Sequence, residues 1–189
     1  MEAGIYAEKI GFLVGSLRKG SYSKQIAQAV AKLLPQDYTP VFVDLSHLEI
    51  YNQDLDDDSM PTEAWKTFRK EIRQLDGIIF VTPEYNRSVP PLLKNALDVG
   101  SRPFGKNAWD NKPALVISVA PGAIGGFGAN HHLRQSLVFV KVPTLQQPEA
   151  YICNVTNLLG EDGTVAKNTL DFLKTIINAY IDFFEKLTK

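Results

Sequence analysis

The stretch that decides the fold reads Ile10-Gly-Phe-Leu-Val-Gly-Ser-Leu-Arg-Lys-Gly-Ser-Tyr-Ser23. It begins with a short, continuous apolar run, which is typical of a strand buried on both faces. The run ends at Gly15, and apolar residues at helical spacing follow from Ile26 until Pro35 ends the pattern. A buried strand, a turn and a helix in this order predict the first unit of a parallel α/β sheet.

The same alternation continues along the chain. Short apolar runs predict further strands at residues 41–43, 78–81, 114–117 and, with the weakest pattern, 144–151. Helical patterns cover residues 65–75 after Pro61, the segment after Pro90-Pro91, residues 129–139 and residues 173–184. We therefore expect a flavodoxin-like fold, a doubly wound five-stranded parallel sheet of order 2-1-3-4-5, as a single domain over residues 1–189. Residues 1–8 are expected to be a flexible N-terminal extension.

Composition narrows the class of protein. The 189 residues are 44% hydrophobic and 22% charged, which excludes wholesale disorder. Twenty basic and twenty-one acidic side chains give a net charge of −1, so no nucleic acid or anionic membrane is expected as a partner. The first eight residues lack a signal-peptide pattern, and no apolar run approaches the ~20 residues of a membrane helix. The single cysteine, Cys153, excludes an internal disulfide and favours a cytoplasmic location.

The loop after the first predicted strand carries three hydroxyl side chains and an arginine: Ser16, Ser21, Ser23 and Arg18. Its glycine spacing is similar to the nucleotide-triphosphate loop, but Ser21 and Tyr22 stand where that loop needs Lys and Ser/Thr, so we exclude a Walker-type ATPase. Free N–H groups at a helix start favour an anion. The alternative is a plain turn in which Ser21 caps the helix. We favour a phosphate site, because a cap needs neither Ser16 nor Arg18.

The loop after the third predicted strand reads Thr82-Pro-Glu-Tyr-Asn-Arg-Ser-Val-Pro90. Two prolines stiffen it, and we expect the backbone N–H groups of Glu84, Tyr85 and Asn86 to stay free to face a ligand. A flat heterocycle with carbonyls and ring nitrogens suits such a row, although a stiff connection before a helix explains this loop alone equally well. In a 2-1-3-4-5 sheet, both loops lie where the strand order reverses, which is where ligands bind.

The two loops together resemble the signatures of the NADPH-dependent FMN reductase family. The resemblance is carried by Gly15-Ser-Leu-Arg-Lys-Gly-Ser21 and, more specifically, by Pro83-Glu-Tyr-Asn-x-Ser-Val-Pro-x-x-Leu-Lys-Asn-Ala-x-Asp98. Gly125-Gly126 and His132-Leu-Arg-Gln135 are also similar to the quinone and chromate reductase branch of that family. The similarity runs over nearly the whole chain.

The resemblance implies noncovalently bound FMN, with NADPH or NADH as the electron donor. The phosphate would lie against Ser16, Leu17, Arg18, Ser21, Tyr22 and Ser23. The isoalloxazine would lie along Pro83, Glu84, Tyr85 and Asn86, with the backbone of Ser118 and Val119 on the other side. The branch often has small hydroxyl residues where Val119, Ala120 and Pro121 stand here, so backbone contact is implied at this edge. Gly125-Gly-Phe-Gly128 is not a dinucleotide fingerprint, and we expect it to let the backbone approach the flavin closely.

The activity implied is reduction of quinones, with chromate, azo dyes or free flavin as further acceptors. A hydride would pass from NAD(P)H to flavin N5 and the electrons onward, without a catalytic side chain. Arg87 or Arg102 would lie near the rim and favour NADPH, and the protein would be a homodimer or homotetramer. The alternative is a flavodoxin-type electron carrier that oxidises no nicotinamide itself. Carriers are usually strongly acidic, so a net charge of −1 argues against that alternative.

Two other clusters are interpreted as structural. His131 and His132 are not expected to bind a metal, because adjacent helix residues point about 100° apart. The acidic run from Asp54 to Asp58 lacks the glycine and glutamate of a calcium loop, and we interpret it as a solvated loop.

Overall fold

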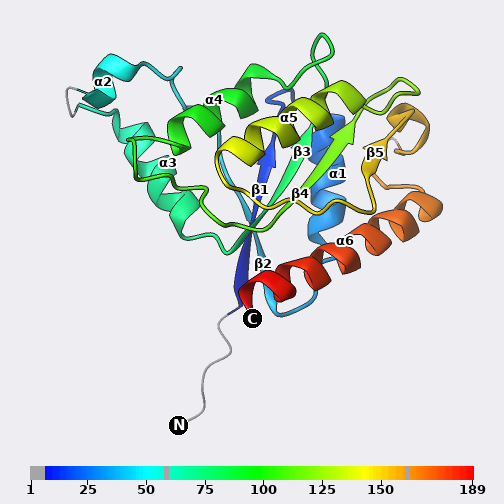
Figure 1. The fold of residues 1–189 in the computed structure, drawn as a ribbon. Coiled ribbons are helices and arrows are strands. Elements are labelled where there is room, and N and C mark those ends of the chain that lie inside the picture. Colours follow the sequence, from blue (N-terminus) through cyan, green and yellow to red (C-terminus); the bar gives the residue numbers. More distant parts are fainter. Residues whose placement is uncertain (1–6, 58–59, 161) are drawn as a thin grey trace.

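The computed structural model describes residues 7–57, 60–160 and 162–189. One parallel sheet runs through its centre in the order β2-β1-β3-β4-β5, which confirms the predicted fold (Figure 1). Its strands are β1 (Glu8–Val14), β2 (Tyr38–Phe42), β3 (Gly77–Thr82), β4 (Ala114–Val119) and β5 (Ala150–Ile152). Both edge strands are interrupted or short, since β2 contains Pro40 and β5 has three residues.

Helices cover both faces of the sheet. One face packs against α1 (Tyr22–Ala31) and α6 (Lys167–Thr188), and the other against α3 (Glu63–Arg73), α4 (Pro91–Gly100) and α5 (Phe127–Phe139). Within β3, Ile78 and Phe80 belong to the core on the α3–α5 side, whereas Ile79 and Val81 belong to the core beside α1 and α6. Because side chains alternate between faces, a strand covered on both sides reads as a continuous apolar run.

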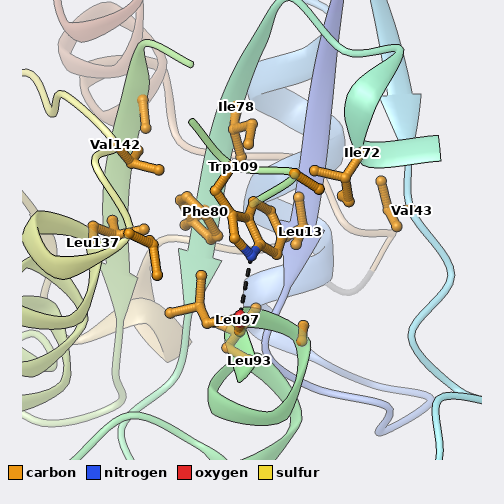
Figure 2. Packing of buried hydrophobic residues seen from close by; sticks show 14 of the residues in the cluster. Leu13, Val43, Ile72, Ile78, Phe80, Leu93, Leu97, Trp109, Leu137 and Val142 are labelled. Carbon is orange, nitrogen blue, oxygen red and sulfur yellow. Dashed lines mark hydrogen bonds between the residues drawn. The ribbon is translucent and has the colours of Figure 1, made fainter. Parts of the chain in front are cut away.

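Trp109 lies at the centre of the core on the α3–α5 side (Figure 2). The side chain is fully buried, and its indole nitrogen donates a hydrogen bond to the carbonyl of Leu97 at 3.1 Å. The indole packs directly on Gly100, where a side chain would collide with it. A buried indole needs a partner for its N–H, so this bond fixes the end of α4 against the sheet.

The structure departs from the predicted elements at three places. Glu8, expected in the N-terminal extension, already pairs with Tyr38 in the sheet; residues 1–6 lie outside the described residues. The last strand is confined to Ala150–Ile152, and Thr144 makes only an isolated bridge with Ala114. Pro143 directly precedes the bridge and Pro148 stands between the two pairings, and proline cannot donate to a ladder.

The acidic run is the third departure. Residues Gln53–Asp57 form the short helix α2. The apolar pattern reveals neither this helix nor the short 3₁₀ helix η1 (Val155–Asn157). The side chain of Asp56 is 4% exposed, and its carboxylate accepts hydrogen bonds from both terminal nitrogens of Arg69 at 2.9 and 2.7 Å. The expectation of a solvated loop was therefore wrong at Asp56; Asp58 lies outside the described residues.

The site follows from the strand order. The order in which strands are added to the sheet reverses between β1 and β3. At this point the backbone nitrogen of Gly15 donates to the carbonyl of Val81 at 2.9 Å. The two predicted ligand loops therefore start side by side. In the described part of the chain, no helix combines the length and apolarity that crossing a membrane requires.

Candidate functional site

The first loop leads into α1 with several hydrogen-bond donors unused. Ser21 is the N-cap of α1, and its hydroxyl oxygen accepts from the backbone nitrogen of Lys24 at 3.2 Å. The hydroxyl still has its own hydrogen to donate. Within the described residues, the backbone N–H groups of Tyr22 and Ser23 have no partner, as expected in the first turn of a helix. The helix dipole adds partial positive charge at this point.

Ser23 and Arg18 add side-chain donors to the same place. Ser23 is 2% exposed overall, and its hydroxyl makes no hydrogen bond to the residues that the structure describes. The guanidinium of Arg18 lies 6.0 Å from the ring centre of Tyr22, and its side chain is exposed. Hydroxyls, free N–H groups and a guanidinium form a donor set suited to a phosphate.

The second loop, residues 83–90, folds back on itself in a tight turn. Asn86 and Arg87 have φ of 50° and 65°, and Tyr85 and Ser88 exchange backbone hydrogen bonds of 3.1 and 3.0 Å. Two successive positive φ values are those of a type I′ turn. The N–H of Tyr85 is therefore used within the loop, and the expectation that it faces a ligand was wrong. The N–H groups of Glu84 and Asn86 have no partner in the described chain.

Glu84 fastens this loop to α5. One carboxylate oxygen accepts a hydrogen bond from the backbone nitrogen of Ala129 at 3.0 Å. The N-cap of α5 is Gly126, which has no side chain to serve the helix start, so Glu84 supplies the acceptor from a distant loop. The second loop and α5 are in close contact: a Cβ on Gly128 would lie 2.5 Å from the carbonyl oxygen of Arg87.

The connection from β4 to α5 forms the third wall. Ser118 is fully buried, and its hydroxyl donates to the carbonyl of Gly125 at 2.7 Å. Gly125 and Gly126 have φ of 63° and 77°, which explains the glycine pair. A Cβ on Gly126 would lie 3.1 Å from that of Ser118, and one on Gly125 would meet Cys153. These glycines thus permit close packing within the chain. Their expected close approach to a flavin stays a prediction.

The three walls enclose a cavity of about 190 Å³. Of the predicted site residues, its lining includes Ser16, Arg18, Ser21, Tyr22, Ser23, Pro83, Glu84, Tyr85 and Val119. Leu17, Asn86 and Ser118 are not in the lining, whereas Ala120 and Pro121 are. Both belong to the loop at the carboxyl end of β4, where the sequence implied backbone contact next to Val119. The volume is below the roughly 300 Å³ at which enclosed ligand pockets begin, so the cavity has room for only one end of a ligand of ordinary cofactor size.

Comparison with known proteins identifies the family. The model of the family described as NADPH-dependent FMN reductase matches residues 8–157. The chain belongs to this family. It is 50% identical over 171 residues to a quinone reductase of Pseudomonas putida, covering 90% of this chain and 91% of that protein. It is 42% identical over 175 residues to a 2-hydroxy-1,4-benzoquinone reductase of Burkholderia sp, covering 92% and 94%.

Structural comparison agrees with the sequence. The flavoenzyme NAD(P)H:(acceptor) oxidoreductase FerB of Paracoccus denitrificans superposes with a TM-score of 0.87 at 35% identity, covering 95% of this chain and 98% of that chain. The predicted resemblance to the FMN reductase family is confirmed.

The two arginines expected at the rim lie far apart in this FMN reductase. Arg87 is in the turn of the second loop, with its guanidinium 3.4 Å from a carboxylate oxygen of Glu84. Arg102 follows the carboxyl end of α4 and donates to the hydroxyl of Tyr51 at 3.1 Å. The ten residues of α4 separate it from the second loop by about 15 Å along the helix axis. The expectation that Arg102 lies near the rim was therefore wrong for this subunit.

The adjacent histidines of α5 contact different neighbours. His131 Nε2 lies 2.9 Å from the hydroxyl of Tyr151, and His132 Nδ1 lies 3.0 Å from the hydroxyl of Ser88. Burial, followed by the hydrogen bond and charge of Glu149, raises the pKa of Tyr151 to about 12. His132 therefore adds a second link between α5 and the loop that lines the cavity.

Proposed function

We propose that this protein is an FMN-dependent NAD(P)H oxidoreductase that reduces quinones. The observation that carries the proposal is the cavity itself, in which the donors at the start of α1 face residues 83–85 and 119–121. Related proteins named for quinone reduction cover nine-tenths of the chain, at up to 50% identity. Chromate, azo dyes and free flavin are further acceptors to test.

Each wall has its own role in this proposal. The first loop holds the FMN phosphate through hydroxyls, a guanidinium and the free N–H groups of α1. Its residues are Ser16, Leu17, Arg18, Ser21, Tyr22 and Ser23. Pro83, Glu84, Tyr85 and Asn86 border the ring on one side, and the backbone of Val119, backed by Ser118, borders it on the other. When bound, FMN supplies hydride acceptance from NAD(P)H and electron delivery to the quinone. The chain's own task is to hold the ring and to leave one face open.

Exposure at the cavity favours an enzyme over an electron carrier. Tyr22 and Tyr85 are the aromatic residues in the lining, and Tyr85 is 47% exposed. A carrier shields its flavin between side chains, whereas a reductase needs an open face for the nicotinamide and then for a flat acceptor. Among the residues that the structure describes, this single subunit brings no second exposed aromatic into the lining to cover the ring. We therefore place donor and acceptor in the same space in turn.

Steady-state kinetics tests the proposal. The purified protein should be yellow, should release FMN on denaturation, and should oxidise NAD(P)H when benzoquinone is present. With both substrates varied, reciprocal plots should be parallel, because donor and acceptor alternate at one place. Full FMN occupancy without turnover for either nicotinamide would favour the carrier. A protein that stays colourless after dialysis against FMN would reject both.

Three further properties belong to the same proposal. We infer one FMN-binding domain over residues 1–189, a homodimer or homotetramer, and a cytoplasmic location. The single sheet with its two covered faces supports one domain. The resemblance to oligomeric reductases supports the assembly, and the single Cys153 supports the location. Sedimentation of the purified protein at several concentrations measures the assembly.

A further inference from the structure

A buried chain of polar side chains lies behind the third wall of the cavity. It starts at Arg134, passes through Asn130 on the same helix, and reaches Ser118 at the end of β4. Asn130 and Ser118 are both fully buried. Polar groups are costly to bury, and each of these is satisfied by the next member of the chain.

Arg134 sets the direction of this chain. Its Nε donates to Asn130 Oδ1 at 2.8 Å, and its Nη1 donates to the carbonyl of Leu145 at 2.8 Å. Because a guanidinium can only donate, the oxygen of the Asn130 amide must face it and the NH₂ group must face the other way. Burial lowers the pKa of Arg134. Its Nη2 is buried and has no hydrogen-bond partner in the described residues, so this cation is held at a cost.

The amide in turn orients the Ser118 hydroxyl. Asn130 Nδ2 lies 3.3 Å from Ser118 Oγ and 3.4 Å from the carbonyl oxygen of Val116. With an N–H pointing at its oxygen, Ser118 directs its own hydrogen to the carbonyl of Gly125 at 2.7 Å. The chain of donors therefore ends on a loop carbonyl.

That carbonyl belongs to a turn that borders the cavity. The nitrogen of Gly125 donates to the carbonyl of Gly122 at 3.3 Å, and the turn follows directly on Val119, Ala120 and Pro121 of the lining. The Ser118 hydroxyl holds the Gly125 carbonyl at the left-handed Gly125-Gly126 pair, where the backbone has the most freedom to shift.

We propose that Asn130 is a positioning residue for FMN, which acts through Ser118 to hold the Gly125 carbonyl and the loop of residues 119–126. The inference rests on the proposed function, since it assigns a support to that site. Asn130 is not one of the residues that line the cavity. Its effect is on the shape of the wall, and FMN affinity is the property that should report it.

Asn130→Asp is the sharpest variant, because it changes one NH₂ group to an oxygen. The bond from Arg134 survives. The Ser118 hydroxyl would turn its hydrogen to the new carboxylate and release the Gly125 carbonyl. We expect FMN binding to weaken about tenfold, or about 1.4 kcal/mol, in a fluorescence titration of the dialysed protein. Ser118→Ala should weaken it to a similar extent, and the double variant should lose no more than either single one.

Asn95→Asp is the matched control. Asn95 on α4 is 8% exposed, accepts from the nitrogen of Tyr51 at 2.8 Å and donates to the carbonyls of Leu48 and Glu49 at 3.3 and 3.0 Å. Asn95→Asp should lower the free energy of unfolding, as Asn130→Asp does, because both disturb a buried amide. It should leave the FMN dissociation constant unchanged. The visible circular dichroism of bound FMN should change in Asn130→Asp and remain unchanged in Asn95→Asp.

The possible outcomes separate the inference from the proposed function. Wild-type protein that binds no FMN rejects both. Wild-type binding with an unchanged dissociation constant in Asn130→Asp rejects the positioning role alone, as does an equal loss in Asn95→Asp. If Asn130→Asp does not fold, Ser118→Ala decides by the same comparison.

Discussion

The carboxylate of Glu84 and the backbone nitrogen of Ala129 meet at 3.0 Å across 45 positions of sequence. The bond joins the loop after β3 to the first turn of α5, which begins at a glycine and has no cap of its own. Two walls of the cavity are thereby fixed to each other. A residue predicted to face the ligand thus also acts as a structural support.

Removing this link should destabilise the protein. We expect Glu84→Ala to lower the free energy of unfolding by about 1–2 kcal/mol, because both the cap and a negative charge at the helix start are lost. Glu84→Gln keeps an acceptor and should lose less. Urea denaturation of FMN-free protein measures both. Glu63→Ala, in the first turn of α3 with 85% of its side chain exposed, is the control and should show the smaller effect.

Arg18 should determine much of the FMN affinity. A charge-assisted hydrogen bond contributes roughly 1.5–3 kcal/mol, so Arg18→Ala should weaken FMN binding on the order of 10- to 150-fold. The neighbouring Lys19 is exposed and does not line the cavity, so Lys19→Ala should have little effect. Fluorescence titration compares the two variants. Equal dissociation constants would place Arg18 outside the phosphate site.

The buried ion pair between Arg69 and Asp56 should be costly to break on one side only. Both side chains are about 5% exposed or less, and Arg69 also donates to the carbonyl of Val99 at 2.8 Å. Arg69→Met should cost about 3–5 kcal/mol, since it leaves Asp56 buried without its partner. Adding Asp56→Leu should recover part of that loss. A double variant less stable than Arg69→Met would contradict this account.

Stability should depend on pH through Glu71. Burial, and then the charge of Asp44, raises the pKa of Glu71 above its ordinary 4.5. A carboxyl group with a raised pKa binds its proton more tightly in the folded state, so its contribution to stability falls as the pH rises above 4.5. Glu71→Gln should therefore be more stable than wild type at pH 7. Urea denaturation at several pH values measures the difference in free energy of unfolding between Glu71→Gln and wild type. This difference should vanish below pH 4.5. The same difference at every pH would contradict burial of the charged carboxylate as the cause.

The sheet and the place of the site could be predicted because both depend on strong local signals. The runs Ile10–Val14 and Ile78–Val81 are apolar on both faces, and two loops at the reversal of strand order then have to meet. The hydroxyls of the first loop were identifiable because a helix start with spare donors is a local pattern.

Contacts between distant segments could not be predicted in this way. The turn at Asn86-Arg87 places an arginine at positive φ, a conformation that arginine does not signal. Asp56 looks solvated in a run of acidic residues until Arg69, thirteen positions later, is placed beside it. Likewise, no local pattern assigns Glu84 to a helix 45 positions away.

The two edges of the sheet limit how one molecule can join another. A long, regular edge strand invites a neighbouring chain to extend the sheet, which is a common start of aggregation. Here Pro40 removes a backbone donor from β2, and β5 offers three residues. Neither edge strand can pair well with a strand of another molecule. Contacts between copies should therefore form through helices and loops, and each sheet should stay within one molecule.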